Sequence, residues 1–154
     1  MKLANSFEIK SAPDTVYATL TDIEKVAPCF PGAKLTHRKS DTSYSGEVRV
    51  KLGPVGVTFI GEMLILSQDA QARRCTLQAR ASDRKQRGSV ESDIVFDVAA
   101  TPAGAQVTIT SEVNLSGPIA QYGRAAGMIE KVAAKNITQF ADALATMIAR
   151  LDEA

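Results

Sequence analysis

The chain has 154 residues, of which 45% are hydrophobic and 23% are charged. This length is typical of one domain and this composition allows a buried core, so we expect a single domain over residues 1–154. The formal net charge of +1 argues against a nucleic-acid-binding protein, and no run reaches the roughly 18 apolar residues that a membrane-spanning helix requires.

The first 32 residues predict a strand followed by two short helices. Residues 3–10 alternate as a strand, with Leu3, Asn5, Phe7 and Ile9 on one face. Ser11 is expected to cap a helix that carries Pro13 in its first turn. A second helical turn follows over residues 22–27 with Asp22 as its cap, and residues 28–32 form a turn.

Six more strands are predicted from the alternation of apolar and polar residues. They cover residues 33–38, 43–52, 57–67, 73–82, 89–99 and 106–115. Most of the connections are short and rich in glycine, proline or aspartate, as in Gly53–Gly56. Consecutive strands joined by short turns indicate an antiparallel sheet.

The chain ends in a long amphipathic stretch. Apolar residues recur with helical spacing from Ile119 to Leu151, and Gly117-Pro118 precedes them. We therefore predict one helix over Gly117–Leu151, about 50 Å long at ~1.5 Å per residue. Only this helix is large enough to cover one face of the sheet.

The predicted fold class is therefore α+β, with a curved antiparallel sheet of about seven strands wrapped around the C-terminal helix. This arrangement is the helix grip. Several residues expected to face the interior are small. They are Gly46, Gly61, Ala79, Ala81, Ser92, Ser111, Ala125 and Ala126. These residues leave two alternatives open, an internal cavity or a core filled by large neighbours such as Phe59, Met63 and Phe96.

Several segments carry characteristic motifs. They are Phe30–Leu35, Tyr44–Val50, Gly53-Pro54, Thr58-Phe59, Gly61-Glu62, Ser82–Arg84, Leu115–Arg124 and Gln139–Ala141. These motifs resemble those of the CoxG family of carbon monoxide dehydrogenase subunits, within the START-like (SRPBCC) superfamily. The resemblance runs from residue 1 to about residue 150, and Leu115–Arg124 is its most specific part.

The resemblance implies a fold, a partner and a place in the cell. START-like domains typically hold an apolar ligand between the sheet and the C-terminal helix. Members of the family accompany molybdenum-containing carbon monoxide dehydrogenases and are implicated in attaching them to the membrane. We therefore expect a cytoplasmic protein at the inner face of the cell membrane. Many members continue past this helix into an apolar tail, and the resemblance implies that such a tail is one means of reaching the membrane.

Catalytic chemistry requires a converging acid, base or nucleophile. The inward polar residues are expected to be Tyr44, Cys75, Ser92, Ser111, Tyr122 and Asn136, without a clear Asp, Glu or His among them. His37 lies beside two basic residues and is expected to be solvated. Cys29 and Cys75 are expected to be reduced, buried thiols, with a disulfide as the alternative. We predict neither an enzyme nor a metal site, because a metal requires three or four converging ligands.

The interior predicts a slot for a hydrophobic molecule. Its candidate ligand-binding residues are Phe30, Val48, Val50, Phe59, Met63, Leu77, Tyr122, Ala125, Ile129, Val132, Asn136 and Phe140. Tyr122 and Asn136 share one helical face and could orient a carbonyl group, or could be ordinary interior residues. With the family context, the expected ligand is a respiratory quinone, menaquinone or ubiquinone, and no covalent cofactor is expected.

Three alternatives stay open. The protein could be a lipid-binding membrane tether or an assembly factor that binds no quinone, or a cyclase- or hydrolase-like enzyme if the strand register were shifted. A basic patch is a candidate surface for anionic lipid or for the dehydrogenase. It consists of Arg80, Arg84, Lys85 and Arg87. The alternative is that these basic side chains are simply solvated and bind no partner.

Overall fold

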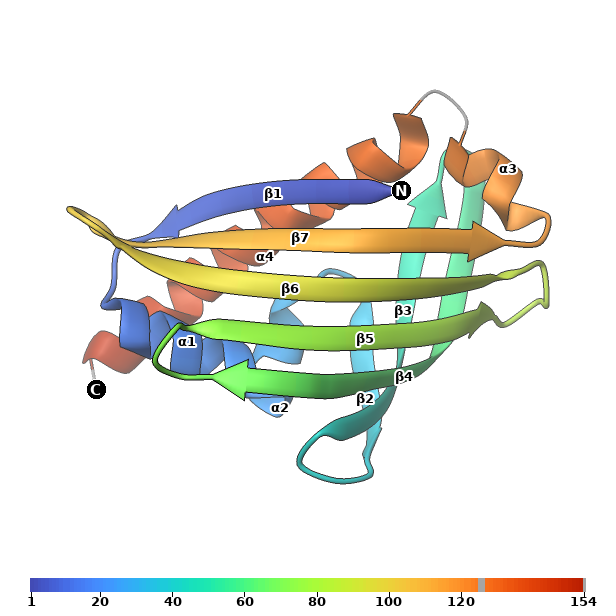
Figure 1. Cartoon of the computed structure of the whole chain (residues 1–154). Helices are drawn as coiled ribbons and strands as arrows, with labels where there is room; N and C mark the ends of the chain where they lie inside the picture. Colours follow the sequence, from blue (N-terminus) through green and yellow to red (C-terminus); the bar gives the residue numbers. More distant parts are fainter. Residues whose placement is uncertain (125–126, 154) are drawn as a thin grey trace.

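A seven-stranded antiparallel sheet is the main element of the fold (Figure 1). The computed structural model describes residues 1–124 and 127–153. Its elements are β1 (Lys2–Ile9), α1 (Pro13–Thr21), α2 (Ile23–Val26), the 3-10 helix η1 (Ala27–Cys29), β2 (Ala33–Arg38), β3 (Ser43–Leu52), β4 (Val55–Asp69), β5 (Arg74–Asp83), β6 (Ser89–Thr101), β7 (Gly104–Ser116), α3 (Ile119–Arg124) and α4 (Met128–Glu153). The strand order is β1-β7-β6-β5-β4-β3-β2. The predicted helix-grip fold is confirmed, and each predicted strand is present within a few residues.

Two facing glycines let the sheet curve sharply. Gly46 of β3 pairs directly with Gly61 of β4, and Gly61 pairs on its other side with Ala81 of β5. A Cβ atom at Gly61 would collide with the main-chain oxygen of Arg80, so the backbones lie closer there than a side chain allows. Figure 1 shows β3 and the first part of β4 turned away from the direction of β5, β6 and β7. This curvature gives the sheet a concave face.

Helix α4 lies across that concave face (Figure 1). Its C-terminal half is firmly packed, because Phe140, Leu144 and Ile148 are buried. The ring of Phe140 lies 6.2 Å, between centroids, from the rings of both Phe7 on β1 and Phe30 after η1. These contacts fix α4 against one edge of the sheet and against the segment between η1 and β2.

The prediction of one unbroken helix over Gly117–Leu151 is wrong. Helix α3 ends at Arg124, and α4 begins at Met128. Gly127 has a φ of +66°, which lies in the left-handed region and is incompatible with a continuing right-handed helix. The apolar spacing continues through the junction, so periodicity alone did not reveal it. As a result, Tyr122 on α3 and Asn136 on α4 do not share one helix face.

The first helix also begins differently from the prediction. Its cap residue is Ala12, which makes no side-chain hydrogen bond to the helix, so Ser11 is not the cap. Instead, the Ser11 hydroxyl donates to Oδ2 of Asp152 at 3.1 Å and connects the end of β1 with the end of α4. The hydroxyl of Ser11 thus bonds to a distant residue of α4 and not to the start of the first helix.

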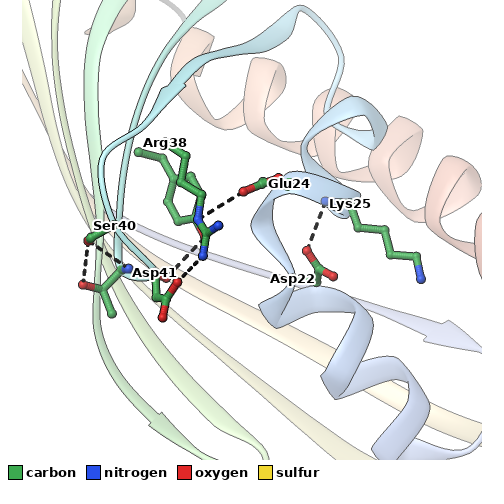
Figure 2. A network of polar contacts seen from close by, with 8 residues as sticks. Asp22, Glu24, Lys25, Arg38, Ser40 and Asp41 are labelled. Atoms are coloured by element: carbon green, nitrogen blue, oxygen red, sulfur yellow. Dashed lines mark hydrogen bonds and ion pairs between the residues drawn. The ribbon is translucent and has the colours of Figure 1, made fainter.

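A polar network joins α2 to the end of β2 (Figure 2). Asp22 caps α2 as predicted, since its carboxylate accepts a hydrogen bond from the amide of Lys25 at 3.3 Å. Nε of Arg38 lies 3.2 Å from a carboxylate oxygen of Glu24, and the same guanidinium pairs with Asp41. This network holds α2 over the sheet beside the concave face.

Candidate functional site: an internal apolar cavity

The space between the concave sheet and α4 is a cavity of about 490 Å³. All seven strands contribute to its wall, together with α1, α2, η1 and α4. Two hydrophobic clusters border it. The larger contains Val16, Leu144 and Ile148, and the smaller is built around Val57 and Ile119. The volume lies within the range of about 300–1,000 Å³ that is common for small-molecule sites.

Small inward side chains explain why the interior is not filled. Residues Gly46, Gly61, Ala79, Ala81, Ser92 and Ser111 all line the cavity, as the first of the two sequence-based alternatives required. Ala125 and Ala126, which were predicted to belong to the same set, lie outside the described residues. Large neighbours such as Phe59, Met63 and Phe96 also line the space, but they do not fill it.

The two halves of α4 have different surroundings. In the C-terminal half, Leu144 and Ile148 are buried in the larger cluster. In the N-terminal half, Ile129, Val132 and Asn136 face the cavity and are only half-buried. The N-terminal half of α4 therefore forms part of the cavity wall, and the C-terminal half fixes the helix to the core.

Most of the predicted ligand-binding residues lie around the cavity. Its wall includes Phe30, Val48, Val50, Phe59, Met63, Leu77, Ile129, Val132, Asn136 and Phe140. Tyr122 does not belong with them. Its side chain is 45% exposed and is absent from the wall as described, because α3 is separated from α4 by the break at Gly127. Ala125 lies outside the described residues, so its predicted role stays a prediction.

Sequence reasoning missed several residues of the wall. Leu20, Ile23 and Val26 of α1 and α2 reach the cavity, as do Leu3 and Asn5 of β1. The apolar face of the short helices and the alternation of residues 3–10 were both visible in the sequence. What was not visible was that these elements face the same space as α4.

Polar groups on the inward face are few and mostly uncharged. Tyr44 points inward, and its hydroxyl donates to the main-chain oxygen of Asp41 at 3.2 Å. Both cysteines are free and buried, and burial raises the pKa of the Cys29 thiol and raises that of Cys75 to about 11. His37 is exposed on β2, as expected. No group of three or more metal-ligating side chains occurs within residues 1–124 and 127–153.

A second, smaller hollow has a basic rim. It measures about 420 Å³ and lies between the β3–β4 hairpin and the β5–β6 connection. Five cationic side chains line it together with one carboxylate, that of Asp83. They are Arg49, Lys51, Arg84, Lys85 and Arg87. The predicted basic patch is therefore present in part and extended by two residues of β3.

The cationic side chains of this rim differ in whether they form ion pairs. Arg84 pairs with Glu47 at 2.9 Å, and Arg87 pairs with Asp83 at 2.6 Å. The ion pairs of the rim within the part of the chain that the structure describes involve these two arginines and neither Lys51 nor Lys85. Arg80, the fourth residue of the predicted patch, is not part of this rim and lies 3.8 Å from a carboxylate oxygen of Glu91.

A curved antiparallel sheet that closes on a C-terminal helix around an apolar cavity defines a START-like domain. The family model for the carbon monoxide dehydrogenase subunit CoxG matches residues 6–149, so the chain belongs to the CoxG family. A search of curated proteins gives no match. None of the helices in the described residues has the length and apolar character needed to cross a membrane.

Solved structures agree on the fold. A conserved protein from Geobacillus kaustophilus has a TM-score of 0.83 at 19% identity, and the match covers 97% of this chain and 96% of that one. The Zhui aromatase/cyclase from Streptomyces sp. R1128 has a TM-score of 0.67 at 14% identity, covering 97% and 94%. A START superfamily protein from Mycobacterium smegmatis has a TM-score of 0.63 at 13% identity, covering 97% and 98%. At these identities, the similarity establishes the fold alone.

Proposed function

We propose that this protein is a non-catalytic accessory protein of aerobic carbon monoxide dehydrogenase that carries a respiratory quinone in its cavity and links the enzyme to the cytoplasmic face of the membrane. The observation that carries the proposal is the apolar cavity of about 490 Å³ between the sheet and α4, in a chain of the CoxG family. A preformed apolar cavity with a few polar groups is the usual form of a site for a hydrophobic ligand.

The choice of a quinone follows from what the partner enzyme must do. Oxidation of carbon monoxide releases electrons, and an aerobic cell passes such electrons to a membrane quinone. The isoprenoid tail of that quinone is poorly soluble in water, so it requires an apolar environment outside the bilayer. A cavity of this size would enclose the ring and the first part of the tail, with the rest of a long tail extending outside.

The character of the cavity wall supports a binding role over catalysis. The inward polar side chains are Asn5, Tyr44, Ser92, Ser111 and Asn136 within the described residues, and none of them carries a carboxylate, an imidazole or an amine. The charged residues of the wall, Lys34, Glu47 and Glu62, take the outward positions in the alternation of their strands. A cyclase or hydrolase would need such groups to converge on the substrate. The aromatase/cyclase among the structural neighbours shares the fold at 14% identity, which carries no catalytic residue over to this chain.

The alternative function is a lipid-binding tether or assembly factor that binds no quinone. The basic rim of the second hollow favours it, because cationic side chains are attracted to anionic lipid headgroups. Both functions would use the membrane surface, and they differ in what the cavity holds.

The deciding experiment is extraction of the purified protein with organic solvent, followed by mass spectrometry. The protein should be produced in a host that makes respiratory quinones. A quinone in near-stoichiometric amount is expected. Phospholipid alone would favour the tether, and an empty extract with no uptake of added quinone would contradict the carrier function.

A matched pair of variants tests whether the quinone occupies this cavity. Ala79→Leu places three further carbon atoms into the space, whereas Ala134→Leu adds the same atoms on the exposed face of α4. We expect Ala79→Leu to lower quinone content at least tenfold and Ala134→Leu to leave it unchanged. Equal quinone content in both variants would place the ligand elsewhere.

A further inference from the structure

Four uncharged polar side chains of the cavity wall face inward without a protein partner among the described residues, whereas Ser45 takes an outward position in the alternation of β3. The four are Asn5 of β1, Ser92 of β6, Ser111 of β7 and Asn136 of α4. All four are half-buried, and the side-chain hydrogen bonds within residues 1–124 and 127–153 involve other groups, such as Tyr44, Ser89 and Thr110. The inward hydroxyl of Tyr44 differs from the four, since it already has a main-chain partner. Four amide or hydroxyl groups thus face the cavity without a protein partner among the described residues.

The register of the sheet places three of these groups in one line. Asn5 pairs with Ile109, and Ser111 lies two residues further along the same strand. Ser92 pairs with Val113, which lies two residues beyond Ser111. Residues separated by two positions share a face, and diagonal neighbours on adjacent strands lie about 7–8 Å apart. Asn5, Ser111 and Ser92 therefore form a diagonal polar line across β1, β7 and β6.

Asn136 extends this line from the helix side. The ring of Phe7 on β1 packs on that of Phe140 on α4, and both elements run in the same direction (Figure 1). Asn5 lies two strand residues before Phe7, or about 6.6 Å. Asn136 lies about one helical turn, or some 6 Å, before Phe140. Asn5 and Asn136 therefore lie on facing walls of the same part of the cavity.

The charged residues of the cavity wall do not face the four polar residues of this line. Lys34, Glu47 and Glu62 take the opposite positions in the alternation of their strands. The carboxylate of Glu47 pairs with Arg84, and that of Glu62 pairs with Lys39. Because Lys34, Glu47 and Glu62 take outward positions, an ionised head group beside the four polar residues would lose its hydration without gaining an opposite charge, which is strongly unfavourable.

We propose that Asn5, Asn136, Ser111 and Ser92 form a polar recognition line that selects an uncharged amphiphile. The carboxamide N–H groups of the two asparagines donate to a carbonyl oxygen of the ligand, and the serine hydroxyls donate to a second oxygen or accept from a ligand hydroxyl. The apolar part of the ligand occupies the space lined by Phe59, Met63 and Val132. This inference rests on the proposed hydrophobic-ligand function and adds the class of head group, which is neutral and oxygen-bearing.

The first part of the test compares ligands on the wild-type protein at pH 7. The three ligands are a short-tailed ubiquinone analogue, a fatty acid with a tail of the same length, and an alkylnaphthalene that carries no oxygen. We expect the quinone analogue to bind at least tenfold more tightly than the ionised fatty acid. Equal or tighter binding of the fatty acid would overturn the selection of a neutral head group while leaving a hydrophobic-ligand function in place.

The second part uses variants that keep the number and branching of the side-chain heavy atoms but remove the amide. Asn5→Leu and Asn136→Leu are each expected to weaken binding of the quinone analogue about three- to tenfold, since a hydrogen bond contributes about 0.5–1.5 kcal/mol. Alkylnaphthalene binding should be unchanged in both, which shows that the cavity has formed. The control is Asn114→Leu, at an exposed position of β7.

The outcomes separate the two proposals. If the leucine variants bind the quinone analogue as tightly as the wild type does, the polar recognition line is wrong and the quinone-carrier function stands. If the wild type binds neither the quinone analogue nor the alkylnaphthalene, the hydrophobic-ligand function itself fails and the recognition line fails with it.

Discussion

The carboxylate of Asp83 at the end of β5 is buried and accepts a hydrogen bond from Nε of Arg87 at 2.6 Å. A second nitrogen of the same guanidinium donates to the main-chain oxygen of Gly56 at 2.9 Å. The main-chain oxygen of Arg87 in turn accepts from the amide of Ile119 at 3.0 Å. One ion pair thus joins the β5–β6 connection, the β3–β4 hairpin and the start of α3, next to the basic rim.

This ion pair predicts how stability depends on pH. Hydrogen bonds from Arg87 lower the pKa of Asp83 from its ordinary value of 3.8 to about 2. A carboxyl group whose pKa is lowered on folding stabilises the native state when the pH is above the pKa of that group in the unfolded chain. This contribution is lost as the pH falls through the pKa of the group in the folded protein. We expect the free energy of unfolding, measured by chemical denaturation, to decrease between about pH 4 and pH 2.

The variant Asp83→Asn should lower stability at pH 7 and reduce the slope of stability against pH in the same window. Asp142→Asn, at an exposed position of α4, serves as the control and should keep the slope of the wild type. An unchanged slope in Asp83→Asn would show that other groups cause the acid dependence.

The bend of β4 requires a glycine at position 61. Adding a Cβ there would force β4 away from the main chain of Arg80, so Gly61→Ala should lower the free energy of unfolding by about 1–3 kcal/mol or more. Gly56 is the matched control, because a Cβ atom at that position would contact nothing within 4 Å. Gly56→Ala should be neutral or stabilise by up to about 1 kcal/mol. Denaturant titration of both variants tests this difference, and equal effects would contradict the role of Gly61.

The two halves of α4 should respond differently to truncation. Leu144 is fully buried, so Leu144→Ala should cost about 2–5 kcal/mol. Val132 is half-buried beside the cavity, so Val132→Ala should cost about 1 kcal/mol or less. Thermal and chemical unfolding of the two variants measure these costs. A large loss for Val132→Ala would mean that the N-terminal half of α4 is packed as tightly as the C-terminal half.

The basic rim predicts how membrane association depends on charge. Lys51 and Lys85 line the rim, and neither forms an ion pair within the described residues, so reversing both charges leaves Asp83 and Glu47 with their partners. A lysine near an anionic surface contributes about 1 kcal/mol, so the double variant Lys51→Glu/Lys85→Glu should bind anionic vesicles at least about thirtyfold more weakly.

Sedimentation with vesicles of phosphatidylglycerol and phosphatidylcholine measures this binding. The double variant Lys10→Glu/Lys25→Glu carries the same change in net charge at exposed positions outside the rim. We expect it to bind as the wild type does. Equal losses in the two double variants would show that net charge, and not the rim, governs binding.

Alternation in the sequence predicted which residues of each strand face the interior. Helical spacing likewise predicted most of the apolar residues with which α4 faces the sheet. Leu77, Ile94 and Val107, for example, all face inward as expected. These properties are local, because a strand repeats every two residues and a helix every 3.6 residues. The small inward residues likewise indicated a cavity but could not by themselves distinguish it from a filled core.

The tertiary structure decided what local patterns could not determine. The left-handed conformation at Gly127 removed Tyr122 from the cavity, although the apolar spacing continued through it. The packing of Phe7 on Phe140 joins β1 to α4 and places Asn5 and Asn136 on the wall of one cavity, although 131 positions separate these asparagines in the sequence. The sequence by itself therefore determined the elements and their faces, because these depend on neighbouring residues. The size of the cavity and the polar groups that meet inside it depend on how distant segments pack together, and only the folded chain determines this.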